Sequence, residues 1–208
     1  MICWHWRGTV FTVDFSFFAV AALVAVRGGA LYFLLLFLAC LLHELGHLAM
    51  LLLFHRHVQT VSLCGAGALF VPSAACGAYW QDILVSLAGP AVNLLLAAAL
   101  GLLGRWWEPL YLLAGAQAVL GCFNLLPILP LDGGRMLWLA LCWGTDPFLA
   151  DRVAQAVSLA AAGLLTVAGA ALARRSPFLL WTAAALLVCA AAPCIKRRRS
   201  VYASHKGR

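Results

Sequence analysis

Long apolar runs dominate the chain, and short polar or basic segments separate them. Most runs approach the ~20 residues that a membrane-spanning helix needs, and the two shorter ones, the fourth and the sixth, require tilt or local thinning of the bilayer. The pattern therefore predicts an all-α membrane protein with six transmembrane helices. The predicted helices cover Val10–Val26, Ala30–Phe54, Ile83–Leu103, Leu110–Leu126, Val153–Leu172 and Phe178–Pro193.

Composition supports this class. Hydrophobic residues make up 65% of the 208 residues and charged residues only 10%, whereas soluble domains carry about 25% charged residues. We expect one six-helix domain over residues 1–195, followed by a basic cytoplasmic tail over residues 196–208. The protein is expected to be a multi-pass membrane protein with the lipid bilayer as its surroundings.

The basic residues predict the orientation of the helices. With both termini in the cytoplasm, ten of the 14 Lys and Arg residues lie inside, and the outer loops hold only Arg27, Arg105, Arg174 and Arg175. This bias follows the positive-inside rule. The net charge of +7 comes largely from the run Lys196–Arg199, which we interpret as an anchor on anionic lipid and not as a nucleic-acid site. The eight cysteines form no C-x-x-C pair and are expected to be reduced, buried thiols.

The most informative motif is His43-Glu44-Leu45-Gly46-His47, inside the second predicted helix. A helix places two histidines four residues apart on one face, where they can share one Zn²⁺ ion while the glutamate serves as a general base. Ionisable groups at membrane depth are costly, at roughly 2.5–3.5 kcal/mol each, and are functional by default. The motif therefore predicts a site that binds one zinc ion per chain.

A catalytic zinc site usually has a third protein ligand. Asp132 is the best candidate, because it follows a run broken by Pro127 and Pro130 and precedes two glycines. Irregular backbone of this kind is tolerated in a membrane only where protein or a water-filled cavity satisfies it. The alternative is that Asp132 caps a helix over Gly133–Cys142. The weaker candidates for the third ligand are Asp14, His5, His55 and His57, and the sequence also leaves Asp82, Asp146, Asp151 and His205 as choices.

With these residues assembled, the chain resembles the site-2 protease family of intramembrane zinc metalloproteases. The resemblance rests on His43–His47 together with Leu131-Asp132-Gly133. Two further segments are similar to the family pattern: Gly65-Ala66-Gly67 resembles its membrane-associated hairpin, and Ala88–Asn93 its Gly-Pro-containing third span. Within the family, the small six-helix layout is most similar to the sporulation branch, whose members act in the bacterial cell membrane. Many members of that branch carry paired CBS repeats, whereas here a basic tail is expected after the last predicted span, so regulation by ATP through such repeats is not implied.

The resemblance implies an intramembrane zinc endopeptidase that cleaves a membrane-associated protein near the cytoplasmic face. Its implied substrate is a sporulation sigma-factor precursor, and inhibitory membrane partners are possible regulators of such a protein. An anti-sigma factor is the alternative substrate. An inactive relative and a zinc-handling membrane protein are the alternative functions.

Two elements are candidates for substrate binding. Residues Val61–Val71, with Gly65 and Gly67, predict a short re-entrant β-hairpin between the second and third helices, whose edge would add a substrate strand; a plain cytoplasmic loop is the alternative. Asn124 would bind substrate or stabilise an oxyanion, or else form an interhelical hydrogen bond. Asn93 and Gln117 present the same two possibilities.

Overall fold

A computed structural model describes residues 2–6, 9–56, 58–64, 67–72 and 78–171 of the chain. The chain divides into two compact units, the first over residues 1–74 and 87–123 and the second over residues 75–86 and 124–208. The described elements are β1 (Ile2–Trp6), β2 (Thr9–Val13), α1 (Phe15–Leu53), β3 (Val58–Cys64), β4 (Gly67–Pro72), α2 (Tyr79–Leu103), α3 (Leu110–Asn124), α4 (Asp132–Gly144) and α5 (Pro147–Ala171).

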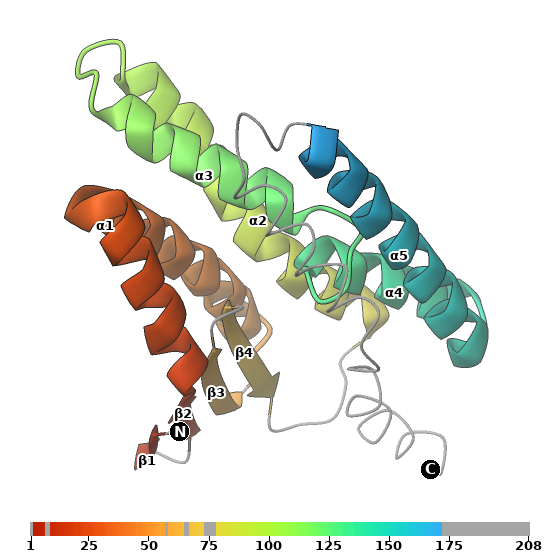
Figure 1. Cartoon of the computed structure of the whole chain (residues 1–208). Coiled ribbons are helices and arrows are strands. Elements are labelled where there is room, and N and C mark those ends of the chain that lie inside the picture. Colours follow the sequence, from red (N-terminus) through yellow and green to blue (C-terminus); the bar gives the residue numbers. More distant parts are fainter. Residues whose placement is uncertain (1, 7–8, 57, 65–66, 73–77, 172–208) are drawn as a thin grey trace. The chain divides into compact units, whose positions relative to one another are not determined.

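In the first unit, α1 is two helices joined at Gly29. This residue has φ 77° and ψ 171°, a conformation that glycine adopts without the steric cost of a Cβ. The chain reverses there, so that α1 forms an antiparallel pair of arms (Figure 1). The sequence predicts this break, since it places separate spans on either side of residues 27–29.

The first unit also contains a four-stranded sheet in the order β1-β2-β3-β4. Strands β2 and β3 are parallel, and the two outer pairings are antiparallel. The doubled-back α1 connects β2 to β3 and allows them to lie side by side (Figure 1), and the hydroxyls of Thr12 and Ser62 form a 2.6 Å hydrogen bond between them.

The sheet corrects two predictions. Residues 10–13 belong to β2 and not to the first spanning helix, because the alternating β-branched run Thr9–Val13 favours a strand. The protein is mostly helical, but the predicted all-α class is wrong for its N-terminal strands. Strands β3 and β4 pair where the hairpin is predicted, with Gly67 opposite Cys64. Gly65 lies outside the described residues. Re-entry of the hairpin into a membrane stays a prediction.

Three of the described helices are long and apolar enough to cross a membrane. They are Gly29–Leu53, Tyr79–Leu103 and Pro147–Ala171, and the shorter apolar helix Leu110–Asn124 adds a fourth candidate. The first arm of α1 is shorter than these three. The sixth predicted helix and the basic tail lie outside the described residues.

In the second unit, the segment before α4 packs against α5 around a small apolar core. Ile128 and Ala162 are fully buried there, with Leu126, Leu131, Ala161 and Leu165 around them. The indole N–H of Trp138 on α4 donates a 2.6 Å hydrogen bond to the Asp151 carboxylate on α5.

Among the described residues, Cys3, Cys40, Cys122 and Cys142 are free thiols, as predicted. Only Cys142 is buried, and the other three are exposed. The prediction of burial is wrong for those three. The reason is that an apolar run does not reveal which face of its helix packs inward.

Candidate metal centre

The His-Glu-x-x-His motif occupies the second arm of α1, within the span-length helix Gly29–Leu53. His43 and His47 are 5% and 8% exposed, and Gly46 is also buried. Leu45 points outward, and Glu44 is half-buried. The helix thus directs both imidazoles to its packed side, and Oε2 of the Glu44 carboxylate is buried as well.

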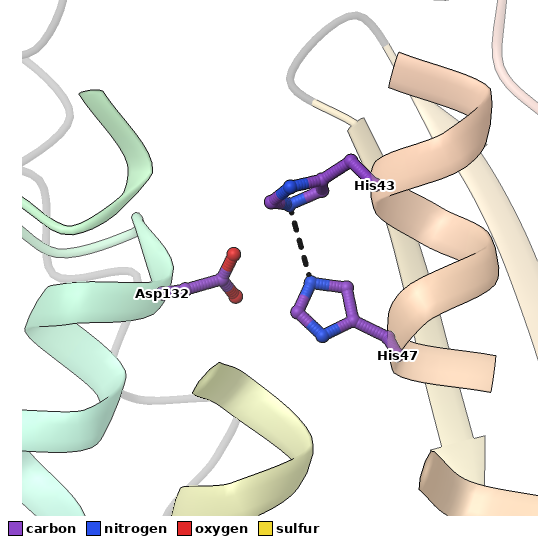
Figure 2. A group of neighbouring side chains, drawn as sticks. All are labelled: His43, His47 and Asp132. Carbon is purple, nitrogen blue, oxygen red and sulfur yellow. Dashed lines mark hydrogen bonds between the residues drawn. The ribbon is translucent and has the colours of Figure 1, made fainter. Parts of the chain in front are cut away.

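The two imidazole rings are close enough to share one metal ion. Their Nε2 atoms lie 3.2 Å apart, and the rings meet edge to face with centroids 4.7 Å apart (Figure 2). Two nitrogens bound tetrahedrally to Zn²⁺ at 2.0–2.1 Å are about 3.3 Å apart. The pair therefore fits zinc with little rearrangement.

Close packing of α2 against α1 holds this pair in place. A Cβ at Gly46 would lie 2.8 Å from the carbonyl oxygen of Ala88 and 3.1 Å from Cα of Gly89. A Cβ at Gly89 would lie 2.4 Å from Nε2 of His47 and 2.9 Å from Cε1 of His43. Gly46 lets the helices approach, and Gly89 leaves room for both rings.

Asp132 is the first residue of α4, in the second unit. The helix cap is Leu131, and no side chain makes a capping hydrogen bond. Asp132 therefore does not fill the role of cap residue that was its alternative interpretation. Its carboxylate is half-buried and is drawn with the two imidazoles in Figure 2.

The two glycines after Asp132 fit α4 against the segment that precedes it. A Cβ at Gly133 would lie 2.2 Å from the carbonyl oxygen of Leu125, and a Cβ at Gly134 would lie 2.5 Å from the carbonyl carbon of Ile128. Both contacts are with backbone, which cannot move aside easily. Glycine is thus required at positions 133 and 134 by close packing at the start of α4.

The remaining candidates occupy other environments. Asp14, between β2 and α1, is exposed, as are His5 and His55; His57 lies outside the described residues. Asn124 is the half-buried last residue of α3. Asn93 and Gln117 are fully buried. The carboxamides of both lack a hydrogen-bond partner in the part of the chain that the structure describes. The interhelical hydrogen bond that was one of their two interpretations is therefore not formed there.

Sequence reasoning missed the packing roles of Gly46 and Gly89, and it missed Ser158, whose hydroxyl accepts a hydrogen bond from the backbone before Asp132. The two glycines had a signal, since each lies inside a motif that was singled out for other reasons. Ser158 had none, because a serine among alanines in an apolar helix is common.

Comparisons with known proteins find zinc metalloproteases among the similar sequences. The model of peptidase family M50 matches residues 102–168, which include Asp132. The chain is 31% identical over 160 residues to the Synechocystis protein sll0528, whose name assigns it to the zinc metalloproteases; the match covers 67% of the chain and 41% of that protein. It is 29% identical over 119 residues to the zinc metalloprotease MJ0392 of Methanocaldococcus jannaschii, covering 52% of the chain and 33% of the relative.

The chain thus spans less than half the length of these relatives. The fold is similar to that of the site-2 protease from Methanocaldococcus jannaschii, with a TM-score of 0.68, 21% identity, and coverage of 91% of this chain and 93% of that one. Part of the chain thus matches the model of peptidase family M50, its sequence is similar to proteins named as zinc metalloproteases, and its fold is similar to that of a site-2 protease.

Proposed function

We propose that the protein is an intramembrane zinc metalloprotease that hydrolyses a peptide bond in a membrane-associated substrate near the cytoplasmic face. His43, His47 and Asp132 are the zinc ligands in this proposal, and Glu44 is the catalytic base. The donor set is two imidazole nitrogens and one carboxylate oxygen, which leaves a fourth zinc position for water. The family and the names of the relatives support the same chemistry.

The observation that carries the proposal is the imidazole pair. Two buried histidines on a helix of spanning length present their Nε2 atoms to each other at 3.2 Å. A purely structural pair would not require a glutamate beside the first histidine or a cleared space at Gly89. A zinc transporter would explain the histidines but not Glu44.

The proposed chemistry is divided between the zinc ion and Glu44. Bound zinc would lower the pKa of a water molecule toward ~7 and polarise the scissile carbonyl. The Glu44 carboxylate accepts the proton of the attacking water and returns it to the leaving amine. Glu44 is half-buried and directly follows His43, a proposed zinc ligand, in the sequence.

We further propose that substrate binds as an added β-strand. A peptide bond within a helix is shielded, so the substrate must be locally extended. Among the described strands, β4 is an edge of the sheet and pairs with β3, and an edge strand can pair with an incoming chain. Gly67 and, in this proposal, Gly65 shape that edge, and Asn124 binds the extended backbone near the cleavage site.

The biological substrate is proposed by analogy with the sporulation branch as a membrane-associated sigma-factor precursor. An anti-sigma factor would use the same chemistry and is the alternative substrate. The proposed setting is the bacterial cell membrane with both termini cytoplasmic, where a cleaved product would be released into the cytosol. Inhibitory membrane partners belong to the same proposal.

The test compares the wild-type protein with Glu44→Gln and with Glu108→Gln, purified in detergent. Zinc content is measured directly, and activity is measured on fluorescently labelled casein, an unfolded protein that needs no unwinding. We expect about one zinc per chain in all three proteins and a loss of cleavage of roughly 10²-fold or more in Glu44→Gln alone. Glu108 is exposed between α2 and α3, so its variant controls for the lost charge. Equal cleavage by Glu44→Gln and wild type would refute the assignment of the base.

A further inference from the structure

The segment that precedes Asp132, residues 127–131, is irregular backbone inside an apolar protein. It joins α3 to α4 and contains Pro127 and Pro130. Its residue Ile128 is fully buried against Ala162 of α5. Backbone N–H groups in such a place must find partners within the protein, because water is not at hand to satisfy them.

Each backbone N–H group of this segment has a partner. The two prolines have no N–H group. The N–H groups of Ile128 and Leu131 donate to the carbonyls of Leu126 and Ile128, each at 2.7 Å. The remaining donor, Leu129 N–H, bonds to the hydroxyl oxygen of Ser158 on α5 at 2.7 Å. Ser158 thus supplies the one hydrogen bond that ties the N–H groups of this segment to a separate helix.

Ser158 lies among apolar residues on α5. It is 1% exposed, and Ala154 and Ala162, one turn away on either side, are also buried. No polar side chain at those two positions can replace it. Asp132 lies three positions after Leu129, and Gly134 packs against the backbone of Ile128 and Leu129, so a shift at Leu129 would move the start of α4.

We propose that Ser158 is a positioning residue for the metal centre: its hydroxyl fixes residues 127–131 so that Asp132 presents its carboxylate as a metal ligand. This inference deepens the proposed zinc protease function and rests on it. The groups that touch zinc remain His43, His47 and Asp132, and Ser158 acts through the backbone.

The first experiment is independent of zinc. Amide hydrogen exchange is measured on the full-length, zinc-free protein in detergent, for wild type, Ser158→Ala and Thr166→Val. Thr166 is the matched control, because it lies on the same helix and its hydroxyl bonds only locally, to the carbonyl of Ala162. In Ser158→Ala we expect the Leu129 amide to exchange roughly 3- to 10-fold faster, the factor expected for one lost hydrogen bond. Unchanged exchange at Leu129 would overturn the inference.

The second experiment measures zinc affinity by competition with a chelator. We expect Ser158→Ala to bind zinc about 10- to 100-fold more weakly, the range seen when a group that supports a ligand is lost, and Thr166→Val to match wild type. Ser158→Cys keeps the side-chain shape with a slightly larger atom that is a weaker acceptor, so it tests the hydrogen bond if the alanine variant does not fold. We expect its affinity to fall between those of wild type and Ser158→Ala.

Asp132→Asn separates this inference from the proposal beneath it. If Asp132→Asn leaves zinc affinity unchanged, the proposed ligand set is wrong. If Asp132→Asn weakens binding while Ser158→Ala and Ser158→Cys bind zinc as wild type does, the ligand set stands and the positioning role of Ser158 is wrong.

Discussion

Gly89 on α2 lies directly against the imidazole of His47 on α1: a Cβ at position 89 would be 2.4 Å from the ring nitrogen Nε2 and 2.6 Å from Cε1. Such a contact is impossible without movement of the ring or of the helix. The absence of a side chain at this position is therefore part of the construction of the metal centre, because it lets a second helix approach the histidines without displacing them.

The first prediction follows from this contact. Gly89→Ala should displace His47, and with it one proposed zinc ligand, so we expect zinc affinity to fall by an order of magnitude or more, in line with ligand-orienting positions in other metal sites. Zinc content after dialysis against a graded chelator measures the effect. Gly101→Ala is the matched control, since it lies on the same helix and its Cβ would meet nothing within 4 Å. Equal zinc retention by the two variants would contradict the prediction.

The second prediction concerns the start of α4. In Gly133→Ala the added methyl group would meet backbone, with Leu125 O at 2.2 Å, and overpacking of this kind typically costs about 1–3 kcal/mol. We expect a lower melting temperature in a thermal-shift assay.

Gly144→Ala provides the control for this change, because position 144 is the last residue of the same helix and is open. A melting temperature of Gly133→Ala equal to that of Gly144→Ala would show that the Leu125–Ile128 backbone yields more easily than its geometry implies.

Much of this organisation follows from local sequence patterns. The histidine motif, the break at Gly29 and the apolar lengths of the second, third and fifth runs are visible in the chain because each depends on residues close in sequence. The N-terminal strands are not visible in this way, because Thr9–Val13 is also apolar enough to extend a helix. The pairing of this segment with β3 depends on residues about 50 positions away. Ser158 is hidden for the same reason, since its partner is 29 residues distant.

The third prediction tests the connection between α4 and α5. Trp138→Phe removes the indole N–H that donates to Asp151 at 2.6 Å while it keeps an aromatic ring. Hydrogen bonds to charged groups contribute about 1.5–3 kcal/mol, so we expect a clear loss of stability in denaturant titrations of the detergent-solubilised protein. Trp143→Phe, at a side chain that is 64% exposed on the same helix, should change stability by less than about 0.5 kcal/mol. Similar losses in both variants would mean that the ring, and not its N–H, is what matters.

The fourth prediction separates the two carboxylates that competed for the third zinc position. Asp132→Asn replaces an anionic oxygen donor with a neutral amide while it preserves size, so zinc occupancy and casein cleavage should both fall, by roughly tenfold or more. Asp14→Asn makes the same chemical change at an exposed residue before α1 and should leave both nearly unchanged. Zinc content and cleavage are measured on the same preparations, so that a loss of activity without a loss of metal can be recognised. The opposite pattern, in which Asp14→Asn loses zinc and Asp132→Asn retains it, would move the third ligand from α4 to the junction of β2 and α1, and the packing of Gly133 and Gly134 would then serve the fold alone.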